Sequence, residues 1–477
     1  MLAQLKRLGG DSLLYALMNV GTKLIAFIMF PIYTHFLPNP ADFGVLDYID
    51  RYAAMLTFVV IFGTDSALAF YYFDTKDEEK RKVYVQNVMV FRIAMVAALF
   101  LLVLLGGSWL SEKLLDNPSL VHLLYLSIGV LFLDTVTALV LTVLRYEFKT
   151  LKVVIFTVLK MLLIAVLSYL LLQFYFASIE SILLGRVISA AVVLLLVGKY
   201  AIKYIRFTFT KPVIRELLKY AAPLVPASVA FWVISNSNVL FLKEYASFTE
   251  VGLYGTAIKF ASLITLLTSG VQMAWRPYSM SIKEKKDSPI LFSKLYIGIL
   301  LLGTFGVMFV ATIMPWVIQL LGDQYYEAYK YVAPVSAVTF LNFYYMIISV
   351  GIFFTKQTKY ISYAFGIAAI INIALNFFLI PVLGIWGTVL SYMLSYVIAV
   401  IFIFIKSQKA YYVPVSSGKM IFLFANMLVA VASIIYVQEN DLSWIYIALA
   451  WVYFLVTLLL SRVDRDFRRK PSQAAEV

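Results

Sequence analysis

Charged residues stand inside long apolar runs of this sequence. In GVLDYIDRYAAML, residues 44–56, the side chains Asp47, Asp50 and Arg51 lie at the head of a run that reaches about residue 72. Ionisable groups inside a membrane are costly, and they tend to face a partner or a water-filled cavity. Asp47 precedes Arg51 by four residues, which predicts an ion pair along one helix. We interpret Asp50 as an interfacial residue at the helix end.

Other charged residues lie deeper in the apolar runs, and all but one of the whole set fall in the first half of the chain. The set is Lys23, Asp47, Asp50, Arg51, Asp65, Arg92, Asp134, Lys160, Arg186 and Lys259. Asp65 and Asp134 are candidates for ion coupling, because a buried carboxylate can carry a proton or bind Na⁺ with neighbouring oxygens. The alternative for both is a salt bridge within the first half, for instance to Lys23 or Lys160. Pairing or snorkelling to a surface is the interpretation for Arg92, Lys160 and Arg186.

The composition indicates a protein that crosses a membrane many times. Of the 477 residues, 62% are hydrophobic and 14% are charged, whereas a soluble domain has about a quarter charged residues. There are no cysteines, and the two histidines, His35 and His122, have no metal-ligand spacing. We therefore expect no metal site, no cofactor and no histidine-based catalytic site.

A window of about 20 apolar residues per helix predicts fourteen membrane spans. Their expected bounds are 12–33, 46–72, 83–106, 119–143, 152–174, 179–202, 215–241, 251–274, 294–320, 331–354, 360–380, 385–405, 418–437 and 443–461. With a cytoplasmic N-terminus, Lys and Arg concentrate in the inside connections, and outside connections hold Lys113, Lys243 and Lys330. The net charge of +13 is thus a topology signal, and we exclude nucleic acid as a partner. Both termini are expected in the cytoplasm.

Two segments of the sequence resemble each other and lie on predicted spans that cross the membrane in the same direction. DFGVLDYIDRYAAMLTFVVIF at 42–62 aligns with EVGLYGTAIKFASLITLLTSG at 250–270, and the alignment places Arg51 on Lys259. The aligned spans are the second and the eighth, so the two halves are expected to be related by a pseudo-two-fold axis along the membrane normal. In transporters built this way the substrate site lies between the halves, and access alternates as one half rocks against the other.

The predicted fold is therefore an all-α polytopic membrane protein with three regions. Residues 1–205 form an N-terminal six-helix lobe, and residues 206–410 form a C-terminal six-helix lobe. Residues 411–477 add two transmembrane helices and a basic cytoplasmic tail.

Several stretches resemble one family. FPIYTHFLPNPADFGVLD at 30–47, KYAAPLVPASVAFWV at 219–233, VGLYGTAIKFASLITLLTSGVQMAWRPY at 251–278 and NIALNFFLIPVLGIWGTVLSY at 372–392 look like polysaccharide (oligosaccharidyl-lipid) flippases. These belong to the multidrug/oligosaccharidyl-lipid/polysaccharide (MOP) transporter superfamily. The resemblance implies movement of undecaprenyl-pyrophosphate-linked oligosaccharides, the repeat units of O-antigen or capsule, from the inner to the outer leaflet of a bacterial cell membrane. H⁺ or Na⁺ is the expected coupling ion, and a polysaccharide polymerase and glycosyltransferases are possible partners alongside membrane lipids.

The resemblance also suggests which cations bind the substrate. Arg51 and Lys259, matched by the repeat, suit a pyrophosphate because Arg and Lys are its natural binders; snorkelling is the alternative. Members of the family often carry a basic residue on span one, here Lys23, and another at the inner end of span eight, here Arg276. A positive-inside anchor is the alternative for Arg276.

Three competing functions remain after the sequence analysis. A lipid II flippase and a multidrug exporter share the superfamily, although a basic cavity favours an anionic substrate. A polysaccharide polymerase or ligase would usually have a large outside loop with catalytic Arg or His, and here every outside connection is short. We therefore expect a transporter and not an enzyme.

Overall fold

The structure is a computed structural model of the whole chain. It describes the backbone of residues 2–201, 209–222, 225–283, 285–355 and 357–463; within these ranges it leaves out the side chains of 2–13, 16, 201, 226–228, 231, 273, 274, 276, 277 and 281. The described residues are helical, with short connections and no strand, which confirms the predicted all-α class. The chain divides into two compact units at residues 232 and 233.

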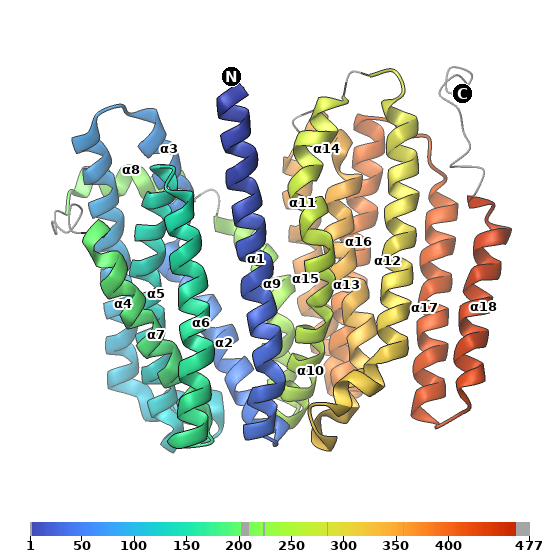
Figure 1. Cartoon of the computed structure of the whole chain (residues 1–477), viewed down its shortest axis with the longest axis horizontal. Helices are drawn as coiled ribbons and strands as arrows, with labels where there is room; N and C mark the ends of the chain where they lie inside the picture. Colours follow the sequence, from blue (N-terminus) through green and yellow to red (C-terminus); the bar gives the residue numbers. More distant parts are fainter. Residues whose placement is uncertain (1, 202–208, 223–224, 284, 356, 464–477) are drawn as a thin grey trace. The chain divides into compact units, whose positions relative to one another are not determined.

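The first unit contains the longest helix of the described chain and a short amphipathic helix at its end. Its helices are α1 (Leu2–Phe36), α2 (Pro40–Ile61), α3 (Thr64–Asp74), α4 (Glu78–Leu115), the 3₁₀ turn η1 (Pro118–Leu120), α5 (Val121–Tyr146), α6 (Thr150–Phe174), α7 (Ile179–Ala201) and α8 (Lys211–Ala221). Helix α9 (Val225–Tyr245) begins in this unit and continues into the next. Figure 1 labels these helices along the chain.

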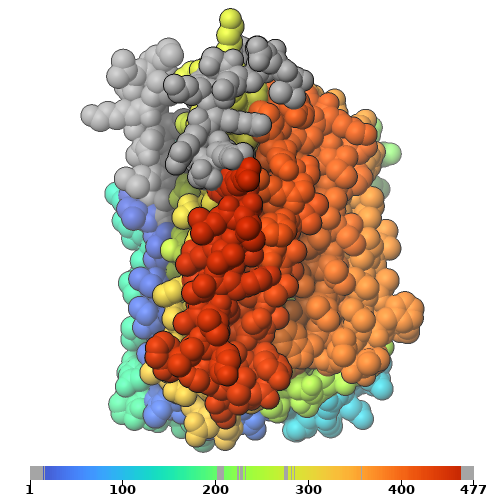
Figure 2. Space-filling view, turned by 90° about the vertical axis from the view of Figure 1, so that its right-hand side faces the viewer, coloured from blue at the N-terminus to red at the C-terminus, as the bar shows by residue number. Residues whose placement is uncertain are grey.

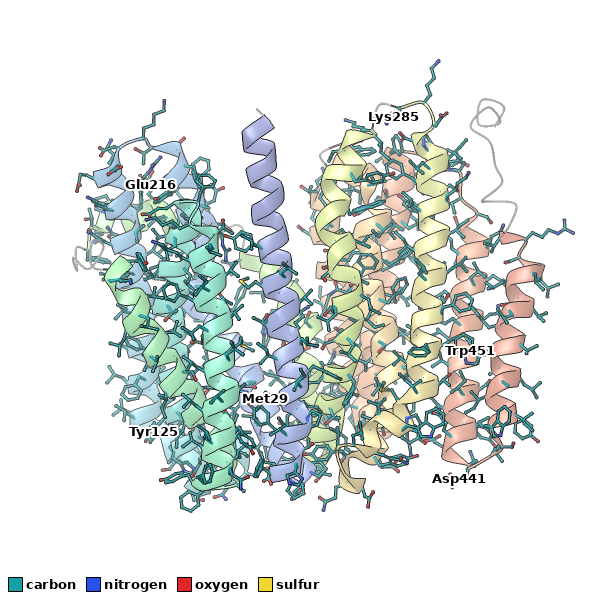
Figure 3. All side chains as sticks on the ribbon, viewed as in Figure 1. Met29, Tyr125, Glu216, Lys285, Asp441 and Trp451 are labelled. Carbon is teal, nitrogen blue, oxygen red and sulfur yellow. The ribbon has the colours of Figure 1, made fainter. Side chains whose placement is uncertain are left out.

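The second unit carries the remaining helices. They are α10 (Phe248–Ala261), α11 (Leu263–Ser281), α12 (Ser288–Gln319), the 3₁₀ turn η4 (Asp323–Ala328), α13 (Tyr329–Ile348), α14 (Val350–Phe354), α15 (Lys359–Leu383), α16 (Ile385–Ala410), α17 (Ser417–Glu439) and α18 (Trp444–Leu460). In this unit Lys285 lies at one end of the helices and Asp441 at the other, with Trp451 between them on α18 (Figure 3).

Helices pack in the same order in both units. In the first, α4 packs on α5, α5 on α7 and α7 on α6; in the second, α12 packs on α13, α13 on α16 and α16 on α15. Helices α17 and α18 follow this series, with α17 on α12 and α18 on α17. The shared packing order is the arrangement that an internal repeat of six spans would produce.

Local sequence signals explain where several helices begin. Asn39 caps α2 by accepting a hydrogen bond from the Ala41 amide at 3.0 Å, and Pro40 occupies the first turn. Asp77 caps α4 in the same way, and Ser247 with Glu250 forms a capping box on α10. Each cap satisfies amides that the first turn of a helix leaves without an intrahelical partner.

Twelve helical segments of the described chain are long and apolar enough to cross a membrane, and α18 is a shorter apolar helix of 17 residues. The seventh expected span, 215–241, is different in the structure. Its beginning belongs to the separate helix α8, and α9 supplies the rest, with residues 223 and 224 outside the description. A hydropathy window averages over this short connection and joins the two helices.

The outer surface of the spans is apolar. Figure 2 views the second unit from the side of α17 and α18. Large side chains of α18 are exposed, among them Trp444, Leu449, Leu459 and Leu460. Contiguous exposed apolar surface of this kind is what a membrane-facing helix presents to lipid.

The second predicted span is interrupted in each unit. The run 46–72 contains α2 and α3, separated by Phe62 and Gly63, whose φ angles are 43° and 69°. The run 251–274 contains α10 and α11, which meet at Ser262. In the first unit Gly63 suits this position, because glycine adopts a left-handed backbone without strain and a β-carbon there would lie only 3.3 Å from the Ala221 side chain of α8.

Candidate functional site: charged pairs in the first unit

The head of α2 carries the ion pair that its spacing predicts. Residues 43–49 are buried, and Asp47 contacts Arg51 through two N–O distances of 3.4 Å. Both side chains are largely buried, at 6% and 19% exposure. The predicted ion pair between Asp47 and Arg51 is confirmed. Any substrate anion that binds Arg51 would therefore bind a guanidinium that already contacts a carboxylate.

Asp50 has an inter-helix partner that its interpretation as an interfacial residue at the helix end did not include. Arg186 of α7 donates Nη1 to Oδ1 of Asp50 at 2.5 Å and Nη2 to Oδ2 at 3.1 Å. This two-pronged geometry is the strong form of an arginine–carboxylate contact. The pair ties α2 to α7, two helices that are far apart in sequence.

A third pair joins α5 and α6. The Lys160 ammonium donates to Oδ1 of Asp134 at 2.5 Å, which is the salt bridge given as the alternative for Asp134. Asp134 also interacts electrostatically with Arg186. Asp50, Arg186, Asp134 and Lys160 thus form a row of alternating charges, which we call the alternating-charge row.

The alternating-charge row is only partly buried. The side chains of Asp50 and Asp134 are each 37% exposed, and those of Arg186 and Lys160 are 23% and 22% exposed. All four lie within helices that are apolar enough to span a membrane. Lipid would not solvate such charges, so this face of the first unit is suited to line a water-filled space.

A fourth pair sits at the break between α2 and α3. Arg92 of α4 donates to Oδ1 of Asp65 at 2.6 Å and to Oγ1 of Thr64 at 2.8 and 3.1 Å. The Tyr146 hydroxyl adds a hydrogen bond to the Asp65 carbonyl at 3.3 Å. Arg92 is 2% exposed, whereas the Asp65 side chain is 47% exposed. The guanidinium therefore fixes the first turn of α3 from the protein interior.

Pairing accounts for eight of the charged residues found in the apolar runs, in four pairs within the first unit. Lys23 is exposed on α1, and Lys259 is half-buried on α10 of the second unit. Arg276 belongs to α11, but its side chain lies outside the described residues. In the structure both coupling candidates, Asp65 and Asp134, pair with a cation. The predicted substrate-binding residues are divided between the two units, and each is described within its own unit.

The second unit has a buried polar cluster that sequence reasoning did not identify as a site. Asn376 donates to Oδ1 of Asn238 at 2.9 Å and to Oδ1 of Asn372 at 3.2 Å, and Ser237 donates to Asn372 at 3.2 Å. All four side chains are buried. The spacing of two asparagines four residues apart in NIALN was the available signal, and sequence analysis used it only for the family resemblance.

This amide cluster connects α9 with α15 without any charge. Nδ2 of Asn372 and Oδ1 of Asn376 have no hydrogen-bond partner within the described chain. Within that same part of the chain, no three His, Cys, Asp or Glu side chains gather in a way that could hold a metal ion.

The fold and the charged face together define a class of protein, namely multi-pass membrane proteins built like transporters. The structure is similar to lipid II flippase MurJ in an inward closed conformation, with a TM-score of 0.67 and 15% identity over 96% of this chain and 100% of that one. It is also similar to the MATE transporter VcmN of Vibrio cholerae, with a TM-score of 0.54 and 13% identity over 85% and 96% of the two chains. An inward-facing multidrug resistance MATE family transporter of the MOP superfamily gives 0.53 and 14% over 82% and 93%.

At the level of sequence, residues 8–283 match the family described as polysaccharide biosynthesis protein, which is more than half of the chain. The chain belongs to this family. No curated protein matches the sequence. The predicted family and the MOP transporter fold are confirmed, and the chain is a multi-pass membrane protein of the polysaccharide biosynthesis family with the fold shared by MurJ and the MATE transporters.

Proposed function

We propose that this protein flips an undecaprenyl-pyrophosphate-linked oligosaccharide, a polysaccharide repeat unit, from the inner to the outer leaflet of a bacterial cell membrane. The cycle is alternating access driven by an H⁺ or Na⁺ gradient, and both termini are cytoplasmic. Family membership and the fold support transport in polysaccharide biosynthesis. The observation that carries the proposal is the partly exposed, charged face of the first unit within its spans.

The charged face can bind a pyrophosphate by exchange of partners. Arg186 and Lys160 already hold carboxylates in short contacts, and phosphate oxygens offer the same anionic acceptors with more charge. Lys23, Arg51, Lys259 and Arg276 are the further cations that we propose for the substrate. A headgroup that displaces a carboxylate keeps the cation paired, and the released carboxylate, 37% exposed, is left to water or to the coupling ion.

Ion coupling follows from the same exchange. Asp134 and Asp65 are the proposed coupling residues, and each touches a cation in the structure. A proton or Na⁺ binds such a carboxylate only when the pair opens, so ion binding and a change of helix contacts are one event. Substrate binding to the released lysine or arginine would then be linked to ion binding through the shared pair.

The direct test is flipping by the purified protein in liposomes. We expect a pyrophosphate-linked oligosaccharide to cross in an ion gradient and to cross far more slowly without one. Arg51→Ala and Lys259→Ala should each reduce the rate about tenfold or more, since each removes one charge-assisted contact. The exposed Lys113→Ala is the matched control and should keep the wild-type rate.

The results that would contradict the proposal are specific. If Arg51→Ala and Lys259→Ala both keep full transport at normal protein levels, the proposal that these two cations bind the substrate is wrong. Export of cationic drugs without movement of the lipid-linked sugar would establish a multidrug exporter instead. Lipid II offered as substrate in the same liposomes tests the second candidate, which the structural similarity to MurJ makes worth measuring.

A further inference from the structure

Helix α8 presents a row of basic side chains. Lys211, Arg215 and Lys219 follow one another at intervals of four residues, so they run along one side of the helix at steps of about 6 Å. Ile214 and Leu217 are buried on the other side. We call the three cations the α8 basic row; all three are exposed.

The buried side of α8 is fixed to the first unit. Ile214, Leu217 and Ala221 belong to an apolar core that includes side chains of α3, α4, α5 and α7. The backbone amide of Thr210 donates to Oδ1 of the buried Asn87 at 2.7 Å at the start of the helix. The helix therefore keeps its apolar face on the protein and its basic row outward.

Aromatic side chains flank α8. Tyr220 stacks on Phe70 with ring centroids 4.8 Å apart, and Tyr71 stacks on Tyr84 at 5.2 Å. Tyrosines concentrate where a membrane protein meets the polar edge of the bilayer. Helix α8 runs across the upright α3 and α4 (Figure 1), as a helix in the plane of the interface would.

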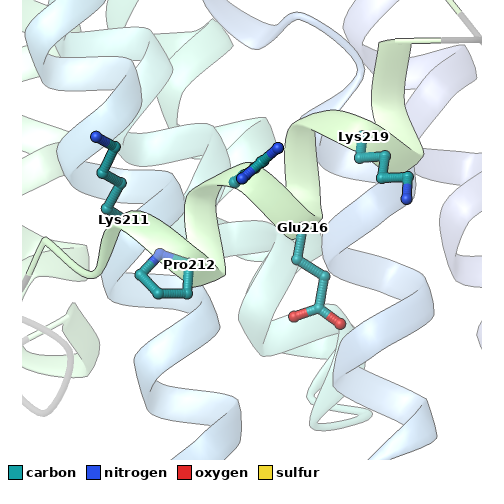
Figure 4. Close-up of a pocket in the computed structure, with 5 residues that line it drawn as sticks. Lys211, Pro212, Glu216 and Lys219 are labelled. Atoms are coloured by element: carbon teal, nitrogen blue, oxygen red, sulfur yellow. The ribbon is translucent and has the colours of Figure 1, made fainter.

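An open pocket of ≈ 550 Å³ lies along this helix, lined by the α8 basic row with Pro212 and Glu216. Lys211 and Lys219 lie toward the two ends of the helix, with Glu216 between them (Figure 4). Glu216, the one acid in the α8 sequence, accepts a hydrogen bond from the Tyr84 hydroxyl at 3.4 Å, on the side of α4. The pocket thus offers three cations against one carboxylate that is already engaged.

We propose that the α8 basic row is a docking site for the phosphate headgroups of anionic phospholipids in the leaflet beside it. The row is complementary to phosphate in charge, and its length of about 12 Å suits two neighbouring headgroups. Exposed Phe209 and Tyr220 flank the row and offer apolar contact to the lipid below the headgroup. The predicted topology places this connection on the cytoplasmic side, where anionic lipid attracts basic segments. None of its residues is among the proposed transport residues.

The experiment measures binding of fluorescent phosphatidylglycerol to the full-length protein in neutral detergent, with fluorescent phosphatidylethanolamine as the zwitterionic probe. The wild type should prefer phosphatidylglycerol. The triple variant Lys211→Gln/Arg215→Gln/Lys219→Gln should lose about tenfold in affinity for that probe, because each exposed ion pair contributes about a twofold to fivefold factor. Its affinity for phosphatidylethanolamine should be unchanged.

A matched control removes the same charge from another exposed site. Lys283, Lys285 and Lys286 lie between α11 and α12 in the second unit, and Lys283→Gln/Lys285→Gln/Lys286→Gln should keep the wild-type preference. If the α8 triple variant does not fold, the double variant Lys211→Gln/Lys219→Gln decides the question through an expected loss of about fivefold.

Three results would overturn the proposal. One is an unchanged preference for phosphatidylglycerol in the folded α8 variant. Another is an equal loss in the control variant, which would mean that net charge alone attracts the probe. The third is displacement of the probe by inorganic phosphate at matching concentration, which would assign a free-anion site instead of a lipid site.

Discussion

The pair between Arg92 and Asp65 allows stability and ion coupling to be separated by mutation. Asp65→Asn leaves the guanidinium of Arg92 buried at 2% exposure, with the Thr64 hydroxyl as its remaining described acceptor. Loss of one partner from a buried pair costs about 3–5 kcal/mol in free energy of unfolding. Arg92→Met leaves a carboxylate that is 47% exposed and can be solvated. The Thr64 hydroxyl also keeps the hydrogen bond that it donates to the Ile61 carbonyl. This change should therefore cost about 1–2 kcal/mol, mainly from the lost contacts of Arg92 with Asp65 and Thr64.

The double variant is the informative one. Asp65→Asn/Arg92→Met removes both charges, and a pair replaced by groups of similar volume is often close to neutral. We expect the double variant to be more stable than Asp65→Asn alone by about 2 kcal/mol. Denaturant unfolding of the purified protein measures the order of the four proteins. Glu79→Gln, which breaks the exposed Glu79–Lys82 pair at the start of the same helix, should stay within about 0.5 kcal/mol of wild type.

Transport then reports the role of Asp65. If Asp65 carries the coupling ion, the double variant regains stability but does not regain gradient-driven flipping in liposomes. A double variant that transports at the wild-type rate would refute the coupling role and leave a structural pair. An Asp65→Asn protein as stable as the wild type would refute the electrostatic reasoning itself.

Three further substitutions test the packing that supports the charged face and the hydrogen bonds of the amide cluster. Gly185→Ala in α7 should destabilise the protein by about 1–3 kcal/mol, because the added β-carbon would lie 2.5–3.0 Å from side-chain and backbone atoms of Ser168. Gly198→Ala in the same helix, with nothing within 4 Å, should instead raise the unfolding free energy by about 0.5–1 kcal/mol; equal effects in thermal unfolding would contradict the packing argument. Asn376→Leu should lower the free energy of unfolding by about 2–3 kcal/mol in denaturant, because the buried carbonyl oxygens of the Asn238 and Asn372 side chains lose the amide that donates to them. An unchanged midpoint would mean that the cluster adds no stability.

Local signals explain what the sequence could predict. Span lengths, apolar runs and the distribution of Lys and Arg depend on one stretch of chain at a time, so the all-helical membrane fold followed from them. The Asp47–Arg51 contact was predictable for the same reason, since helix geometry alone brings residues four apart together.

Contacts between helices could not be obtained in this way. Asp50 and Arg186 are 136 positions apart, and their pairing depends on how α2 packs against α7. The backbone break at Phe62 was missed because phenylalanine gives no signal for a left-handed conformation, and the hydropathy of the run continues through it. The roles of Lys23, Arg51, Lys259 and Arg276 remain predictions for transport assays.

The pairing of charges in the first unit has an electrical consequence. Moving one elementary charge through a membrane potential changes the free energy by about 2.3 kcal/mol per 100 mV. Each of the four pairs contains one acid and one base, so a displacement of these helices with their pairs intact moves no net charge through the field. Those eight residues therefore add no voltage sensor to the unit. Any dependence of the transport rate on membrane voltage would then report the charges that travel, which are the lipid-linked anion and its coupling ion, together with any pair that opens to receive them.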